Sequence, residues 1–207
     1  MIIGIPVYDK VDLLDVAGPR EVLTWMSPAA EVRLIAETPG EITTRDGLTF
    51  IARFDFNDTP ALDVLWVPGG DPQALKTIMT GPNGAYLDFL RARSATAKYV
   101  CSVCEGALLL AQAGLLDGYE ATTHWAFIPC LKRFPQIRVA PGTPRFVHDR
   151  NRLTGGGISA GLDEALKLVE LLSGTEAAQD VQQTIQYYPD PPVSSQIPQS
   201  TECPFCW

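Results

Sequence analysis

The chain has 207 residues, 46% hydrophobic and 19% charged, which fits one globular domain and excludes a wholly disordered protein. It carries 24 acidic and 16 basic residues, a formal net charge of −8, and no run of Lys and Arg that could neutralise a phosphate backbone, so we do not expect a nucleic-acid partner. No apolar stretch reaches the roughly 20 residues of a membrane span, and no basic segment precedes the first apolar run, so we expect a cytoplasmic protein that does not enter a membrane.

The predicted elements begin with an apolar strand at residues 2–7, typical of a strand buried on both faces of a parallel sheet. A helix is predicted over residues 20–26, because Pro19 suits the first turn of a helix, where its missing N–H costs nothing. Asp15 is therefore expected close to the N-terminus of a helix.

Two further strands are predicted at residues 31–36 and 42–54, the second interrupted by a hairpin turn at Asp46-Gly47 that leaves the main sheet. The apolar run 64–67 stops at the sequence Pro-Gly-Gly-Asp-Pro, residues 68–72, which predicts a sharp loop at the carboxyl end of a strand.

Helices and strands continue to alternate in the second half of the chain, which predicts an α/β fold with a doubly wound, mostly parallel sheet. The predicted elements are a helix near 84–94, a strand at 99–103, a helix from 107 capped by Gly114, a strand at 152–154 and a helix through 162–172. Residues 189–207 hold five prolines and no apolar period, so we expect one domain over 1–188 and an irregular Pro-rich tail over 189–207.

Five cysteines are an odd number in a chain too long to need disulfide staples, so we expect at least some free thiols. Cys101 and Cys104 are three residues apart, which places their side chains on opposite faces of a strand, so we expect no disulfide between them and assign Cys101 to the core. In the tail, Cys203 and Cys206 could form a local disulfide or offer two metal ligands. With only two histidines in the chain, the donors fall short of a zinc site, and we predict no metal.

Cys104 is the candidate nucleophile, because it falls where a strand turns sharply into a helix, at the edge of the sheet where ligands bind. The positive end of the following helix favours a thiolate, and small Gly106 and Ala107 leave room for a close approach. The alternative is a buried, inert cysteine. Asp15 is either a helix-capping residue or, beside Cys104 in a closed pocket, a carboxyl group that keeps its proton and serves as a general acid.

The sequence resembles the ThiJ/PfpI superfamily and, within it, the isocyanide (isonitrile) hydratases, from Gly4 to about Tyr188. The resemblance rests on six stretches: Leu14-Asp15-Val16-Ala17-Gly18-Pro19, Val67-Pro68-Gly69-Gly70, Ser102-Val103-Cys104, Ala113-Gly114-Leu115-Leu116, Ala121-Thr122-Thr123-His124-Trp125 and Leu153-Thr154-Gly155-Gly156-Gly157-Ile158.

The resemblance implies a flavodoxin-like three-layer sandwich, as in class I glutamine amidotransferases, and a homodimer with no metal or organic cofactor. It implies that Cys104 attacks the terminal carbon of an isocyanide while Asp15 donates a proton, giving a thioimidate that water converts to an N-substituted formamide. The backbone N–H of Glu105, next to Cys104, and that of Gly70, next to Gly69 in the loop after residues 64–67, are expected to polarise the substrate.

Glu105 departs from the family pattern, which has threonine after the cysteine in the hydratases and histidine in the peptidase-like branch. The missing histidine argues against a peptidase-like Cys-His pair, and an extra carboxylate would raise the pKa of the thiol or change the substrate preference. His124 remains a possible catalytic residue or a packed structural one. The alternatives to hydration are a glyoxalase-like activity on α-oxoaldehydes and a non-catalytic redox sensor or ligand-binding module built on Cys104.

Overall fold

The computed structural model describes residues 1–26 and 28–205. Its centre is a seven-stranded sheet in the order β10-β11-β7-β6-β1-β2-β5. All neighbouring strands are parallel except the pair β10–β11, so the predicted mostly parallel sheet is confirmed. The strands are β1 (Ile2–Pro6), β2 (Glu31–Ala36), β5 (Phe54–Asp55), β6 (Val64–Val67), β7 (Tyr99–Ser102), β10 (Phe146–Asp149) and β11 (Arg152–Gly155).

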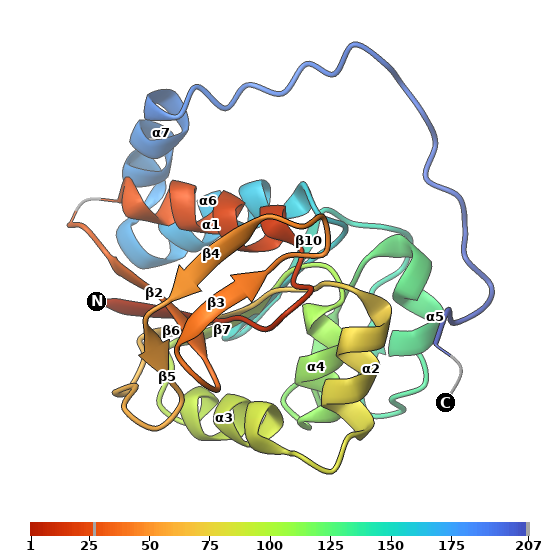
Figure 1. Ribbon diagram of the computed structural model, residues 1–207. Coiled ribbons are helices and arrows are strands. Elements are labelled where there is room, and N and C mark those ends of the chain that lie inside the picture. The colour runs from red at the N-terminus through yellow and green to blue at the C-terminus, as the bar shows by residue number, and fades with distance from the viewer. Residues whose placement is uncertain (27, 206–207) are drawn as a thin grey trace.

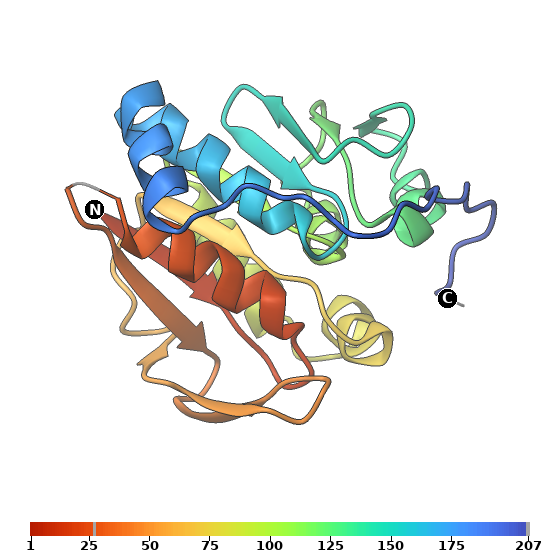
Figure 2. The ribbon, with the colours of Figure 1, turned by 90° about the horizontal axis from the view of Figure 1, so that it is seen from above.

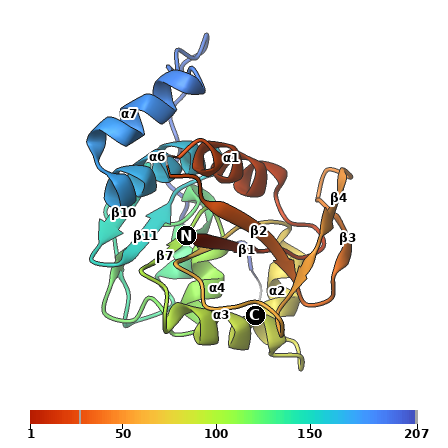
Figure 3. The same cartoon turned by 90° about the vertical axis from the view of Figure 1, so that its left-hand side faces the viewer.

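Helices cover both faces of the sheet and make the expected three-layer sandwich (Figure 1). One face carries α1 (Leu13–Thr24), α6 (Ala160–Ser173) and α7 (Thr175–Thr184), and the other carries α2 (Pro72–Thr80), α3 (Ala85–Ser94) and α4 (Gly106–Gln112). Figure 3, seen along the sheet, separates the two helical layers. The short helices η1 (Trp125–Phe127) and α5 (Ile128–Leu131) extend the α4 side.

The sheet has one hydrophobic core on each face, because successive side chains of a strand point to opposite sides. Ile3, Ile5 and Trp66 pack with α1 and α6. Leu65 and Val67 pack with α2, α3 and α4. All five side chains are buried, as the uninterrupted apolar runs predict for strands covered on both faces.

The hairpin predicted around Asp46-Gly47 is confirmed: β3 (Gly40–Thr43) and β4 (Thr49–Ala52) form a separate two-stranded sheet. The prediction for Pro19 was wrong. The helix begins at Leu13 and Pro19 lies inside it. Several elements were not predicted: the helices α2, α5 and α7, the strand β10, and the small parallel pair of β8 (Glu120–Ala121) and β9 (Arg138–Val139).

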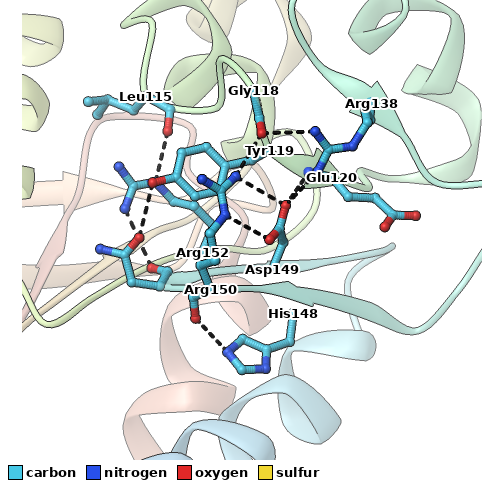
Figure 4. Close-up of polar contacts among 10 residues, drawn as sticks. Leu115, Gly118, Tyr119, Glu120, Arg138, His148, Asp149, Arg150 and Arg152 are labelled. Carbon is cyan, nitrogen blue, oxygen red and sulfur yellow. Dashed lines mark hydrogen bonds and ion pairs between the residues drawn. The ribbon is translucent and has the colours of Figure 1, made fainter.

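Stacked cations fasten the β8–β9 pair to the β10–β11 hairpin (Figure 4). The guanidinium groups of Arg150 and Arg152 lie 3.7 and 4.6 Å from the ring centre of Tyr119. The Asp149 carboxylate binds Arg150 and Arg138 at 2.9 and 3.0 Å, and the hydrogen bonds to Arg150 lead the contacts that lower the pKa of Asp149 to about 2. This network holds the rim of the sheet next to β11.

The tail beyond α7 has no helix or strand over residues 185–205 and runs across the molecule toward α5 (Figures 1 and 2). Cys203 forms a disulfide with Cys130 of α5. The option of a local disulfide between Cys203 and Cys206 was therefore wrong, because the tail folds back onto the domain and Cys203 pairs with Cys130. Cys206 lies outside the described residues. Cys101 and Cys104 are free, and Cys101 is buried in the core, as expected; Cys104 is buried as well, although a nucleophile open to a cavity was expected. No helix among the described residues is both long enough and apolar enough to cross a membrane.

Candidate functional site

The candidate site lies where three adjacent parallel strands end. Val67 of β6 pairs with Ser102 of β7, which pairs in turn with Thr154 of β11. The loops that follow these strands therefore meet at one edge of the sheet. They carry Gly69-Gly70, Cys104 and Gly156-Gly157, and the start of α1 adds Asp15.

Cys104 occupies a strained backbone corner between β7 and α4. Its φ is 57°, a left-handed conformation that non-glycine residues rarely adopt and that marks nucleophile turns. The backbone N–H of Cys104 donates to the carbonyl of Gly156 at 2.8 Å, and the hydroxyl of Thr123 donates to the carbonyl of Cys104 at 2.8 Å. Gly106 opens the next turn so close to the Val67 carbonyl that a Cβ atom would overlap it. Neighbouring loops thus hold the strained corner.

Asp15 is held in place through its backbone carbonyl, because Pro19 removes the hydrogen bond that this carbonyl would accept within α1. Because Pro19 has no N–H, the carbonyl of Asp15, four residues earlier, receives no bond from position 19. The buried indole N–H of Trp66 donates to that carbonyl at 3.2 Å. The buried Asp15 side chain accepts the N–H of Gly69 at 2.8 Å through Oδ2, whereas Oδ1 has no partner among the described residues.

Burial raises the pKa of the Asp15 carboxyl group well above its ordinary value, and the charges of Asp12 and Glu105 raise it further. The Gly69 N–H opposes this shift only in part. These surroundings therefore favour the protonated form of Asp15 more than water does. Because Oδ2 accepts the Gly69 N–H, the unpartnered Oδ1 is the oxygen that is free to carry a proton.

Burial also raises the pKa of the Cys104 thiol, followed by the charges of Asp15 and Glu105. The backbone N–H of Ile158 opposes the rise. The expectation that the helix end would favour a resting thiolate is not met, because burial and two carboxyl groups outweigh a helix of seven residues. The thiol holds its proton until a neighbouring base accepts it.

The carboxyl group of Glu105 lies next to the Cys104 thiol and accepts a hydrogen bond from it. Burial raises the pKa of its carboxyl group, but the shift is opposed by hydrogen bonds from the Cys104 thiol, from its own backbone N–H and from the N–H of Gly70. The N–H groups of Gly70 and Glu105, expected to polarise substrate, thus face the Glu105 carboxylate in this structure. Gly69 packs against the same group: a Cβ there would approach Cys104 Cβ and Glu105 N to 2.8 Å.

His124 lies beside the site in a packed environment. Its ring is 5.4 Å from Trp125 and 5.9 Å from Phe127 between ring centres, and its Nδ1 accepts the N–H of Ala126 at 3.3 Å. Burial lowers the pKa of His124, which favours the neutral ring. The described contacts include no hydrogen bond from His124 to Cys104.

A cavity of about 310 Å³ opens beside the nucleophile. Thr123, Gly156 and Ile158 line it, and each also bonds to the backbone or sulfur of Cys104. Leu14, Trp125 and Ile197 add apolar walls. Cys104 itself is only 2% exposed, so a slender group is required to reach its sulfur.

Several residues of the site were not singled out individually from the sequence. Ile158 has a φ of 25° and turns its N–H to the Cys104 sulfur. Thr123 and Trp66 hold the nucleophile loop and the acid. The Thr-Thr-His-Trp and Thr-Gly-Gly-Gly-Ile stretches marked these loops, but the pairing of donor and acceptor depends on tertiary contacts. Among residues 1–26 and 28–205, no group of three or more His, Cys, Asp and Glu side chains is arranged to hold a metal ion.

Comparison with known proteins matches residues 2–171 to the model of the DJ-1/PfpI family. The chain is 41% identical over 196 residues to an isonitrile hydratase of Pseudomonas putida, covering 95% of this chain and 82% of that protein. It is 36% identical to a ThiJ/PfpI family protein of Pseudomonas syringae of known structure, with a TM-score of 0.84, covering 93% of this chain and 77% of the other. It is also 30% identical to the HTH-type transcriptional regulator GbdR of Pseudomonas aeruginosa over 81% of its own length, but this match spans only 42% of the regulator.

Proposed function

The chain belongs to the DJ-1/PfpI family, and on that premise we propose that it is a cysteine-dependent hydratase that converts an isocyanide to an N-substituted formamide. The observation that carries the proposal is the buried Cys104 sulfur beside the carboxyl groups of Asp15 and Glu105, next to a cavity whose lining residues Thr123, Gly156 and Ile158 bond to Cys104. The terminal carbon of an isocyanide is a slender, linear electrophile, which suits a sulfur with so little exposed surface. The 41% identity to the hydratase of Pseudomonas putida supports the same substrate class.

In the first proposed step, the Glu105 carboxylate accepts the proton of the Cys104 thiol as the sulfur attacks the terminal carbon. Asp15 donates the proton on Oδ1 to the same carbon. The products are a neutral thioimidate on Cys104, an Asp15 carboxylate and a protonated Glu105. Burial favours a proton on Asp15, and the hydrogen bonds that Glu105 accepts from the Cys104 thiol and from the N–H groups of Gly70 and Glu105 oppose the rise in its own pKa.

In the second proposed step, the Asp15 carboxylate removes a proton from water as the water oxygen attacks the thioimidate carbon. Glu105 protonates the substrate nitrogen. The carbon–sulfur bond then breaks, the hydroxyl proton passes through Glu105 to the leaving sulfur, and the formamide is released. Both carboxyl groups and the thiol return to their starting states, so the cycle adds one water molecule and needs no cofactor.

The proposal is tested by incubating the purified protein with an alkyl isocyanide and, separately, with methylglyoxal, and following the products. We expect formamide from the isocyanide and no lactate from the aldehyde. Turnover of the aldehyde alone would favour the glyoxalase-like alternative. If neither substrate is converted, and Cys104→Ser and wild type are equally inactive, the sensor or binding module is favoured. The raised pKa of the buried Cys104 thiol argues against an oxidant-sensitive thiolate.

We also propose that the enzyme is a homodimer. An apolar groove of about 490 Å³ between α1 and β4 is lined by residues including Val16, Leu34 and Phe50, and its rim leaves Leu48 and Ile51 about half exposed. A second copy would cover this surface. Sedimentation equilibrium of wild type and Ile51→Glu decides the point, since a monomeric wild type contradicts it.

A cytoplasmic location is likewise a proposal. The free thiols Cys101 and Cys104 suit a reducing compartment, whereas the Cys130–Cys203 disulfide is unusual in one. Alkylation of the free thiols in intact cells, followed by peptide mapping of Cys130, distinguishes a reducing from an oxidising compartment. In a cytoplasmic protein, a substantial fraction of Cys130 is expected to be reduced and therefore alkylated.

A further inference from the structure

The tail is anchored at both ends. Near its start, the hydroxyl of Tyr187 donates to Asp163 of α6 at 3.1 Å, and its carbonyl accepts the side-chain amide of Gln182 of α7 at 3.1 Å. Near its end, Cys203 is joined to Cys130, and Phe205 is 3% exposed with its ring 5.2 Å from that of Phe127. Figure 2 shows the chain between these anchors crossing from α7 to the α5 side.

The middle of the tail reaches the cavity beside Cys104. Residues 189–199 are exposed to solvent, yet Ile197 forms part of the cavity wall together with Leu14, Trp125 and Ile158. Its side chain is 56% exposed, so one side faces water and the other faces the cavity. Val193, four residues earlier, is 78% exposed and does not line this cavity.

We propose that Ile197, held over the cavity by the doubly anchored tail, is a specificity-determining wall that limits the size of the substituent on the substrate. This inference rests on the proposed function, because it assigns the reacting end of the substrate to Cys104 and its substituent to the cavity. The wall selects isocyanides with small or slender apolar substituents.

The Cys130–Cys203 bond is what keeps Ile197 in place. From Tyr187 to Cys203 the chain has no helix, no strand and few contacts, so its position depends on its ends. A flexible segment of this length that is free at one end spreads over a large volume, and the time that any residue spends at one place falls accordingly. Loss of the disulfide therefore removes the wall without changing a residue of the cavity.

The test compares wild type, Ile197→Ala, Cys203→Ala and, as the matched control on the same tail, Val193→Ala. The ratio of kcat/KM for cyclohexyl isocyanide to that for methyl isocyanide is measured for each. We expect the ratio to rise about tenfold in Ile197→Ala and Cys203→Ala, which is the scale of discrimination that a small apolar contact provides. It stays at the wild-type value in Val193→Ala. An unchanged ratio in Ile197→Ala would show that Ile197 does not limit the substituent. An unchanged ratio in Cys203→Ala would show that the disulfide does not hold Ile197 in place.

A second readout does not depend on isocyanide turnover. Alkylation of Cys104 by iodoacetamide and by N-cyclohexylmaleimide is followed by mass spectrometry of the peptide that contains it. The rate with the bulky reagent, relative to the small one, is expected to rise in the same two variants and not in Val193→Ala. A raised alkylation ratio without turnover of any isocyanide would contradict the proposed function and support the role of Ile197. Hydration of isocyanides with unchanged ratios would support the proposed function and contradict the role of Ile197. Because Ile197 is exposed, Ile197→Ala is expected to keep the wild-type melting temperature and decides the question even if Cys203→Ala misfolds.

Discussion

Cys104, Asp15 and Glu105 form one buried cluster: Asp15 and Glu105 raise the pKa of the Cys104 thiol, Glu105 raises that of Asp15, and the hydrogen bond from Cys104 opposes the rise at Glu105. Three negative charges could not be held together in this surrounding, so protons are shared among the groups. The thiolate can form only when a carboxyl group takes up its proton, which couples the nucleophile to its neighbours.

Asp15→Asn is expected to lower kcat/KM about 100- to 10,000-fold, because the amide cannot donate the proton that the attacked carbon requires. The Asn oxygen can still accept the Gly69 N–H, so the melting temperature is expected to stay near the wild-type value or to rise. Removing the Asp15 charge also lowers the pKa of Cys104, so iodoacetamide should modify the variant at lower pH. Wild-type activity should fall as the pH rises through the raised pKa of Asp15, since the protonated acid is the active form. Full activity in Asp15→Asn would refute the assignment.

Glu105→Gln is expected to make Cys104 easier to alkylate and turnover slower. The carboxylate raises the pKa of the thiol by its charge and by accepting its hydrogen, so its loss favours the thiolate. The amide cannot protonate the substrate nitrogen, so the thioimidate should accumulate and the steady-state rate should fall. Exposed Glu41→Gln serves as the control. If alkylation and turnover rise together, Glu105 takes no part in proton transfer.

At the scale of single residues, the sequence predicted which residues form the site better than it predicted their hydrogen bonds. The short motifs placed Cys104 on a sharp turn and Asp15 near a helix start. They could not show that the N–H groups of Gly70 and Glu105 face the Glu105 carboxylate, or decide between the packed and the catalytic interpretation of His124. Those outcomes depend on loops from distant parts of the chain.

At the scale of elements, α1 and β6 are coupled through the gap at Pro19. Trp66→Phe should destabilise the fold by about 1–3 kcal/mol, because the Asp15 carbonyl then remains buried without a donor. In Trp66→Phe with Pro19→Ala, the new N–H at position 19 can bond to that carbonyl, so the double variant should be more stable than additivity predicts. Urea denaturation of wild type, Trp66→Phe, Pro19→Ala and the double variant measures this coupling. Additive effects would mean that the indole hydrogen bond does not compensate for the proline.

Helix α6 places a second buried acid behind the nucleophile loop. Glu164 is fully buried, neither of its carboxyl oxygens has a hydrogen-bond partner among the described residues, and it packs against Gly155. Burial, followed by the charge of Asp15, raises its pKa well above the ordinary value. The folded state therefore binds this proton more tightly than the unfolded chain does.

Glu164→Met should stabilise the protein by about 1–3 kcal/mol at pH 8, where the folded wild type must either hold a proton that the unfolded chain releases or bury a charge. The stability contributed by the protonated acid is fully present below the unfolded pKa and is lost as the pH rises toward the folded one. The difference between variant and wild type should thus grow from pH 4 to pH 8 and be small for the control Glu176→Gln, whose side chain is exposed. A difference that does not change with pH would rule out the titration of Glu164.

At the scale of the whole molecule, alternating apolar strands and helices were enough to predict a doubly wound, mostly parallel sheet, and the family resemblance implied the three-layer sandwich. The weakest predictions fell on short or polar segments: β8, β9 and β10 have four residues or fewer, and α7 is mostly polar. Proline chemistry favoured a helix start at Pro19, but the tertiary bond from Trp66 allows the helix to run through it. The disulfide between Cys130 and Cys203 joins residues 73 apart, and sequence spacing alone does not reveal such a pair.

The central claim is that Cys104 forms a covalent bond to the carbon of the isocyanide during hydration, and this bond can be observed directly. Wild type mixed with an alkyl isocyanide and quenched in acid within a turnover should gain the mass of one isocyanide, on the peptide that contains Cys104. Cys104→Ser should show neither the added mass nor formamide. Formamide production by Cys104→Ser at the wild-type rate would contradict the account.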